Sequence, residues 1–374
     1  MATPVLVIYG GQSSEHEISC RSANFIIKTL MNRVDVCLGV MGIDREGAWH
    51  PQEPKKLLSL SQESLPILKD LRLPEEDPAK PWNPAARIVS YMEKLTSKSL
   101  NTKDICVFMV THGTNGEDGN LQGFLELTGF SYIGPDTLGS AIGMDKEIAK
   151  ILIERAGLNV APFFAVRREK WSSLGKDSIL KAALDLGFPL YVKPASLGSS
   201  VGISKVTHQQ ELERAIALAF EFDEKILIET GLDIREIELA ALGTYIPEVS
   251  RPGEINATAE FYTFEAKYLS ATGATIQVPA AIDAKSEAYV RELTVKAFEA
   301  LQLYGIARID WFLEKKTGKF YFNEVNTLPG FTSISQYPKL WEASGLDSST
   351  LLRQMIDFGL KRRELRNSLN RKQK

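Results

Sequence analysis

Apolar and polar positions follow two different periods in the first 130 residues. Short apolar runs at 5–9, 34–41 and 105–111 are typical of buried strands, and an amphipathic segment at 15–30 separates the first two runs. Strands that alternate with helices pack as a mostly parallel sheet with helices on its faces. The pattern therefore predicts a parallel α/β layer at the N-terminal end of the chain.

Two further units follow along the chain. The second begins near residue 145 and predicts a small α+β lid, whereas the third begins near residue 231 and is rich in strands. The expected elements are a strand at 189–193, a helix at 211–222 and a strand at 225–229 in the lid, followed by strands at 236–242, 306–313 and 319–325. We therefore expect an α/β protein with three domains, at 1–140, 141–230 and 231–374.

Length and composition agree with a multidomain enzyme. A chain of 374 residues exceeds what one hydrophobic core usually serves, and its apolar runs are too short to span a membrane. Five prolines within 66–84 predict a loop or an insertion there. The N-terminal strand has no basic flank and no small-residue cleavage site, and three widely spaced cysteines fit buried thiols in a reducing compartment. The expected location is the cytoplasm.

Charge is distributed unevenly. The net charge of -3 gives no reason to expect nucleic acid as a partner. Residues 361–374 nevertheless carry seven Lys or Arg and one Glu. Because short runs of like charge usually face water, we interpret this tail as the solvated end of a helix.

Two strands near the C-terminal end carry the clearest chemical signal. Segments 306–313 and 319–326 flank a turn-like stretch at 314–318 and predict a hairpin. Alternation puts Arg308 and Asp310 on one face of the first strand and Glu324 and Asn326 on one face of the second. If Leu313 pairs with Lys319, then Arg308 lies opposite Glu324.

This hairpin predicts a magnesium site. Asp310, Glu324 and Asn326 would form a cluster of hard oxygen ligands, and two neighbouring carboxylates ionise together most readily around a cation. The alternative is a surface hairpin with one cross-strand ion pair between Arg308 and Glu324.

A second signal is the strand and loop at 191–202, which contains Lys193 followed by glycines and serines. Backbone N–H groups in such a loop can cradle phosphate, and the lysine adds a positive charge. No Gly-x-x-x-x-Gly-Lys segment occurs, so a P-loop fold is disfavoured. A glycine-serine hairpin without a ligand is the alternative.

Two glycine-containing turns complete the candidate chemistry. At 10–17, Ser14 and Glu17 form a plausible capping box, whereas Glu15 at the helix N-terminus could hold a substrate ammonium or merely complement the helix dipole. At 112–119, His112 could line a site or cap its loop.

Taken together, these segments resemble the D-alanine:D-alanine ligase family of the ATP-grasp superfamily. The likeness covers nearly the whole chain and fails mainly in the proline-rich stretch. It rests on residues 10–19 (GGQSSEHEIS), 112–123 (HGTNGEDGNLQG), 144–146 (MDK), 192–194 (VKP), 198–202 (GSSVG), 265–268 (EAKY), 308–310 (RID) and 323–330 (NEVNTLPG).

The resemblance implies a three-domain ATP-grasp fold, with an N-terminal domain on the substrate side and ATP between the lid and the C-terminal catalytic domain. It also implies two Mg²⁺ ions, with Mn²⁺ as an alternative metal. The implied metal ligands are Asp310, Glu324 and Asn326, and the implied ATP-binding residues are Lys146, Lys193, Ser200, Glu229, Leu232, Glu236 and Lys267.

The family reaction joins two D-alanines through a D-alanyl phosphate and serves peptidoglycan precursor synthesis. By resemblance, Glu15 holds the first ammonium, His112 helps to orient substrate, and Arg308 stabilises the tetrahedral oxyanion. The second D-alanine would bind near Ser335 and the backbone of Gly330.

A gate over the site is also implied. Glu15, Ser199 and Tyr268 would form a hydrogen-bonded triad that closes a loop at about 259–280, which would protect the acyl phosphate from water. A homodimer is expected by resemblance alone.

Three positions depart from the family pattern. Gln336 stands beside the second substrate where leucine or methionine is more usual, and Trp311 and Phe322 are bulkier than the common aliphatic residues. Tyr268 favours the dipeptide product, but Gln336 leaves D-alanine:D-lactate and D-alanine:D-serine ligases as alternatives. A non-catalytic ATP-binding module is the alternative from another class.

Overall fold

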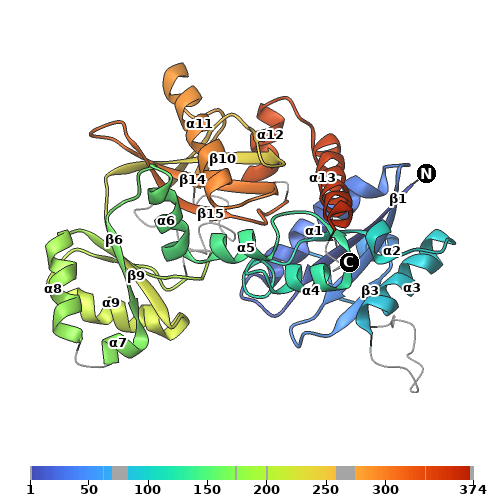
Figure 1. Ribbon diagram of the computed structural model, residues 1–374, viewed down its shortest axis with the longest axis horizontal. Coiled ribbons are helices and arrows are strands. Elements are labelled where there is room, and N and C mark those ends of the chain that lie inside the picture. Colours follow the sequence, from blue (N-terminus) through green and yellow to red (C-terminus); the bar gives the residue numbers. More distant parts are fainter. Residues whose placement is uncertain are drawn as a thin grey trace.

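The computed structural model contains three β-sheets in a row, with most of the helices packed around them (Figure 1). It describes residues 2–61, 63–69, 83–172, 175–198, 201–257, 274–332 and 334–370. Among these residues, no helix is both long enough and apolar enough to cross a membrane.

The first sheet has the order β3-β2-β1-β4-β5. β1, β2, β4 and β5 are parallel, and only β3 is antiparallel to its neighbour. This confirms the α/β layer. Its strands are β1 (Thr3–Gly10), β2 (Val36–Ile43), β3 (Trp49–Gln52), β4 (Cys106–Met109) and β5 (Ser131–Tyr132), and the associated helices are α1 (His16–Met31), α2 (Pro54–Leu60), α3 (Pro84–Thr96), the short 3₁₀ helix η1 (Thr102–Asp104) and α4 (Asn120–Thr128).

The second sheet is antiparallel and has the order β6-β9-β7-β8. It has its own core, in which Leu190, Ile216 and Ile228 are fully buried. The strands are β6 (Phe163–Arg167), β7 (Leu190–Pro194), β8 (Ser204–Val206) and β9 (Lys225–Thr230), and the helices are α7 (Arg168–Ser172), α8 (Lys176–Leu186) and α9 (Gln209–Phe222).

The third sheet is also antiparallel and has the order β13-β12-β10-β14-β15, with β11 paired to β10. Two helices, α5 (Thr137–Met144) and α6 (Lys146–Arg155), come before the second sheet in the sequence. Ala149 and Ile153 of α6 nevertheless belong to the hydrophobic core of the third sheet. Its other elements are β10 (Ile234–Gly243), β11 (Pro247–Val249), β12 (Gly253–Ala257), β13 (Ala274–Gln277), α11 (Ala284–Ala300), β14 (Gly305–Glu314) and β15 (Phe320–Asn326).

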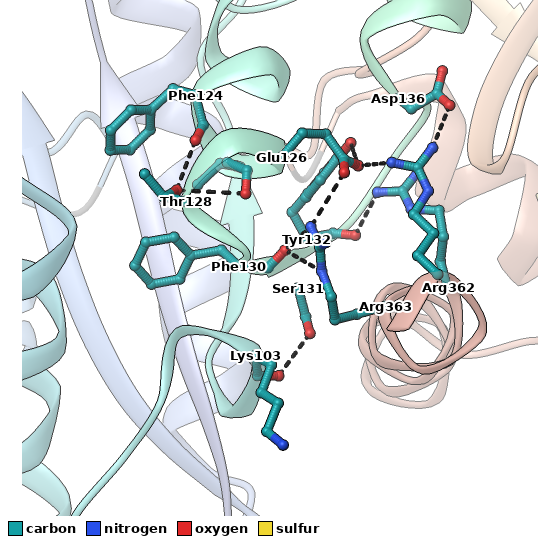
Figure 2. A network of polar contacts seen from close by, with 12 residues as sticks. Lys103, Phe124, Glu126, Thr128, Phe130, Ser131, Tyr132, Asp136, Arg362 and Arg363 are labelled. Carbon is teal, nitrogen blue, oxygen red and sulfur yellow. Dashed lines mark hydrogen bonds and ion pairs between the residues drawn. The ribbon is translucent and has the colours of Figure 1, made fainter. Parts of the chain in front are cut away.

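The last two helices, α12 (Gln336–Ala343) and α13 (Ser348–Ser368), return to the first sheet and share its core. The prediction of a solvated basic tail is wrong for Arg362 and Arg363, which are buried, although the preceding Lys361 is exposed. Figure 2 shows both arginine side chains pointing from α13 toward the segment around β5, where they bind the backbone carbonyls of Phe130, Tyr132 and Gly134. These carbonyls supply the hydrogen-bond partners that a buried guanidinium needs.

The proline-rich stretch is partly outside the described residues, which omit 70–82. The prediction of a loop is wrong for Pro84, which occupies the first turn of α3. Its missing N–H is not needed there, and Asn83 caps the helix. Cys20 and Cys106 are buried as expected, whereas Cys37 is only partly buried.

Candidate functional site

One face of the third sheet collects the charged side chains. On β10 and β14, alternate residues such as Ile237, Leu239 and Ile309 enter the hydrophobic core of this sheet. The intervening positions place Glu238 and Arg308 on the opposite face. Alternation, as expected from the sequence, puts a polar surface on one side and a packed core on the other.

The predicted hairpin register is wrong. Leu313 pairs with Phe320 instead of Lys319, and the register shifts by one more residue next to Asp310. Asp310, not Arg308, therefore lies opposite Glu324, and Arg308 lies opposite Asn326. The shift leaves Asn323 as an extra residue on β15, which is a β-bulge. A bulge inverts the alternation of faces, so Phe322 and Val325 both enter the core although they are three positions apart, which regular alternation would place on opposite faces. The four predicted polar groups still share one face.

Arg308 is held by two carboxylates. Its Nε and Nη2 atoms each donate to one oxygen of Asp310 at 2.8 Å, and its Nε atom also lies 3.2 Å from Oε2 of Glu238. Glu238 is 4% exposed and was not predicted from the sequence. The sequence could have indicated Glu238, because it lies two residues after the predicted site residue Glu236 and therefore on the same face of the strand. The fork of the guanidinium thus has a fixed orientation on the sheet.

The predicted metal ligands fit a magnesium ion. Asp310 and Glu324 are paired across the ladder, and the neighbouring Asn326 has a buried Oδ1 atom with no hydrogen-bond partner among the described residues. Two carboxylates and an amide oxygen suit a hard cation that retains several water molecules. In the described part of the chain, no group of three His, Cys, Asp or Glu side chains is arranged to hold a metal.

Lys146 reaches this cluster from α6. Its ammonium lies 3.3 Å from Oε2 of Glu324 and donates to the backbone carbonyl of Leu197 at 2.7 Å. The preceding Asp145 caps α6 by accepting from the backbone N–H groups of Glu147 and Ile148. The first turn of α6 therefore places a cation between the glycine-serine loop and the acidic cluster.

Two further cations contact Glu229 on β9. Lys193 of β7 and Lys150 of α6 lie 3.1 Å and 2.9 Å from the same oxygen of this carboxylate. Burial alone would raise the pKa of Glu229, but the two ammonium groups hold that pKa below its ordinary value. Lys193 and Glu229 were predicted as ATP-binding residues, whereas Lys150 was not predicted at all.

The two other predicted adenosine-binding residues follow Glu229 along the chain. Leu232 is in the connection between β9 and β10, and Glu236 is on β10 opposite Phe312. Ser199, Ser200, Lys267 and Tyr268 lie outside the described residues, as does most of the predicted gate at 259–280.

Glu15 lies where α1 begins, at the turn after β1. The predicted capping box is wrong, because the N-cap is Glu15 and no side-chain cap bond forms, while Glu17 pairs with Arg45 on the surface. Gly10 permits the turn, since its φ is +89° and a Cβ would lie 2.2 Å from the carbonyl oxygen of Ile43.

The Glu15 carboxylate is buried against two other loops. A Cβ on Gly113 would lie 2.7 Å from its Oε2 atom, and one on Gly198 would lie 3.6 Å away. The N-terminal turn, the loop after β4 and the glycine-serine loop therefore meet at this carboxylate. The meeting point is one residue from the predicted triad member Ser199.

His112 lies inside the protein rather than at a loop surface. Its Nε2 atom is 3.4 Å from Oγ of Ser22, and its Nδ1 atom is 3.9 Å from Oε1 of Glu117. Burial alone would lower the pKa of His112, but the Glu117 carboxylate, helped by Glu15, raises the pKa above its ordinary value. Both carboxylates thus favour the charged form of the His112 imidazole.

Gly330 and Ser335 form the turn into α12. The Oγ atom of Ser335 accepts from the backbone N–H of Thr332 at 2.8 Å, and a Cβ on Gly330 would lie 3.2 Å from it. Ser22 accepts from the backbone N–H of Phe331 and also contacts His112, so this turn adjoins the N-terminal substrate loops.

Gln336 follows this turn, and its side-chain amide faces the Glu238 carboxylate, to which it donates when the amide nitrogen is turned toward that group. The two other departures from the family pattern, Trp311 and Phe322, pack edge to face in the core of the third sheet, away from the polar face. Of the three departures, only Gln336 is next to a residue of the polar face.

The sequence is similar to known proteins along nearly its whole length. Models of the family match at residues 4–135 ("D-ala D-ala ligase N-terminus") and 152–357 ("D-ala D-ala ligase C-terminus"). The chain is 43% identical to D-alanine–D-alanine ligase A of Bradyrhizobium diazoefficiens, over 98% of this chain and 97% of the relative. It is 40% identical to the ligase A of Escherichia coli, over 97% of each chain.

Solved structures agree. The D-alanine–D-alanine ligase of Coxiella burnetii matches with a TM-score of 0.77 and 31% identity over 99% of this chain and 97% of that one. The VanG D-Ala:D-Ser ligase of Enterococcus faecalis matches with a TM-score of 0.78 and 33% identity over 96% and 100%. The predicted ATP-grasp fold class is confirmed, and the chain belongs to the D-alanine–D-alanine ligase family.

Proposed function

We propose that this protein is an ATP-dependent ligase that joins two D-alanines into D-alanyl-D-alanine, a building block for peptidoglycan precursors. One observation carries the proposal: Arg308, Asp310, Glu324 and Asn326 share one face of the third sheet, and Lys146 reaches the same face. A phosphoryl group and an acyl group can both react there, because the former needs cations and the latter needs a donor aimed at an oxyanion.

Binding of ATP is assigned to residues from four segments. Lys146, Lys193 and Lys267 would contact its phosphates together with Ser200, and Glu229, Leu232 and Glu236 would hold the adenosine. Asp310, Glu324 and Asn326 would hold two Mg²⁺ ions, for which Mn²⁺ could substitute. When bound, these ions neutralise charge on the phosphates.

In the first half-reaction, a carboxylate oxygen of D-alanine attacks the γ-phosphorus, the bond to the β,γ-bridging oxygen breaks, and ADP leaves. Glu15 would hold the D-alanine ammonium, and the neighbouring His112 would orient the substrate. The contact of Glu15 with Gly113 and Gly198 supports this, because it places the carboxylate at the meeting point of three loops.

In the second half-reaction, the free amine of another D-alanine attacks the acyl carbon and loses a proton, and phosphate leaves. The guanidinium of Arg308 would stabilise the oxyanion, and Ser335 and Gly330 would hold the second carboxylate. Glu15, Ser199 and Tyr268 would close the gate that keeps water from the acyl phosphate.

A D-alanine:D-serine ligase is the second candidate function. The VanG neighbour and the polar Gln336, which faces Glu238 beside Arg308, favour it. An ADP-release assay with D-alanine alone, and with D-alanine plus D-serine or D-lactate, separates the candidates. We expect D-alanine alone to give the faster turnover near neutral pH, and faster turnover with a mixed pair would overturn the dipeptide assignment.

The same assay tests the rival from another class. A non-catalytic ATP-binding module would release no ADP in response to D-alanine. We also propose a homodimer, which light scattering on the purified protein would test directly, since a monomeric mass at micromolar concentration would contradict it.

A further inference from the structure

Lys150 is a buried charge that the proposed reaction does not use. Its side chain is 0% exposed on α6, one turn after Lys146, which faces the acidic cluster. Its ammonium is 2.9 Å from Oε2 of Glu229, 3.4 Å from the backbone carbonyl of Phe322, and 5.7 Å from the centre of the Phe163 ring. An ammonium in such a place carries a large desolvation penalty, and burial lowers the pKa of Lys150 to about 8.

Two ammonium groups lie within ion-pair distance of the one Glu229 carboxylate, and Glu324 attracts Lys150 more weakly. One carboxylate is shared by two ammonium groups, those of Lys150 and Lys193, at nearly equal distances. A single lysine would neutralise Glu229, so the second is surplus for stability alone. The two lysines differ in their surroundings: Lys193 ends β7 directly before the glycine-serine loop, whereas Lys150 is enclosed between the second and third sheets.

That difference indicates that Lys150 and Lys193 have different roles when a nucleotide binds. If Glu229 had only one lysine, the turn of that lysine to a phosphate would leave the buried carboxylate without a countercharge. The loss of the countercharge would favour protonation of Glu229. Only the lysine next to the loop can make that turn. The enclosed lysine can remain where it is.

We propose that Lys150 is a positioning residue for the nucleotide: it stays on Glu229 when Lys193 binds phosphate, and it keeps that carboxylate ionised to accept from the exocyclic amine of adenine. The inference rests on the proposed function, from which it takes the placement of adenosine at Glu229. It adds the reason that an adenine is selected over a base with an oxo group. An ionised carboxylate accepts from an amine but repels a carbonyl oxygen, whereas a neutral carboxyl group could donate to that oxygen.

The test compares ATP with inosine triphosphate, which carries an oxo group in place of the amine. In Lys150→Met, we expect KM for ATP to rise about 10-fold or more, and the ratio of kcat/KM for ATP to that for inosine triphosphate to fall by a similar factor. KM for D-alanine is expected to stay unchanged. Calorimetric titration with ADP and inosine diphosphate gives the same comparison without catalysis.

Two variants separate this role from a structural one. Lys225→Met removes another buried lysine, which binds Asp145 at 2.5 Å and Glu147 at 2.8 Å, and it is expected to lower the melting temperature without changing the nucleotide preference. Lys150→Arg, which keeps the charge, is expected to retain much of the preference for ATP.

A double variant covers the case in which Lys150→Met does not fold. Adding Lys150→Met to Glu229→Gln leaves no unpaired carboxylate and should cause little further change in nucleotide affinity, because Lys150 is argued to act through Glu229. An additional loss of about 10-fold or more in the double variant would overturn the proposal.

The outcomes distinguish the two proposals. A wild-type protein that forms no ADP in response to D-alanine refutes the proposed function. An active wild type, combined with an unchanged nucleotide preference in Lys150→Met, refutes the role of Lys150 alone.

Discussion

Replacing Arg362 by methionine should markedly destabilise the protein, although the residue lies in a basic segment near the C-terminal end. Its Nη1 and Nη2 atoms donate to the carbonyls of Gly134 at 2.6 Å and Tyr132 at 3.1 Å (Figure 2). Its guanidinium also lies 4.0 Å from the ring centre of Tyr132 and 5.1 Å from that of Tyr304. The contacts join α13 to β5 and to the segment that leads into β14.

The magnitude follows from these contacts. Two hydrogen bonds from a charged donor contribute about 1.5–3 kcal/mol each, and a buried cation over an aromatic ring adds about 1–2 kcal/mol. Against this, burial lowers the pKa of Arg362, so its charge carries a desolvation penalty that methionine does not have. We expect a net loss of about 3 kcal/mol in the free energy of unfolding. For a chain of 374 residues that unfolds as one unit, this lowers the melting temperature by about 4 °C.

Differential scanning calorimetry of Arg362→Met beside Lys361→Met checks the reasoning. Lys361 is the preceding residue of α13 and is exposed, so its replacement should change the free energy of unfolding by less than about 0.5 kcal/mol. If Arg362→Met melts within about 1 °C of Lys361→Met, the buried arginine contributes no net stability.

Three further predictions concern the site. Arg308→Ala should lower turnover by about 10² with little change in KM for ATP, as loss of an oxyanion donor does, and a steady-state assay with wild-type turnover would refute that role. Asp310→Asn should raise the Mg²⁺ concentration needed for half-maximal rate by about 10-fold or more, since the ion loses a charged ligand; an unchanged titration would remove Asp310 from the metal site. The pKa of His112 is raised in the folded protein, so the stabilisation by Glu117 is fully present below about pH 6.5 and is lost as the pH rises through the raised value. Denaturation of Glu117→Gln should therefore show a larger loss at pH 5.5 than at pH 9, and an equal loss at both would contradict the imidazolium.

Much of the architecture could be predicted from local patterns. The apolar runs gave β1, β4, β10, β14 and β15 to within a few residues, whereas β11, β12 and β13 were not predicted. Alternation placed Arg308 and Asp310 on one face. These properties are local, because side-chain direction along a strand depends only on the neighbouring residues. For the same reason, the glycine turn after β1 and the loop after β7 were recognisable as candidate binding segments.

Long-range features were not recognisable in this way. The bulge at Asn323 depends on how Phe322 and Val325 both fit one core, and it adds one residue to the offset that the turn had already introduced, since Leu313 pairs with Phe320. In the sequence, Lys150 is an ordinary polar position of a helix, and only the fold places Glu229 of β9 beside it. Likewise, Arg362 has the sequence pattern of a solvated residue, and only the packing of α13 brings it to the carbonyls next to β5.

The sequence by itself thus indicated which residues could carry the chemistry and which face of a regular strand each one occupies. Only the tertiary structure decided which of them meet, because the countercharge of a buried ion comes from whichever segment packs against it, and that segment can lie anywhere in the chain.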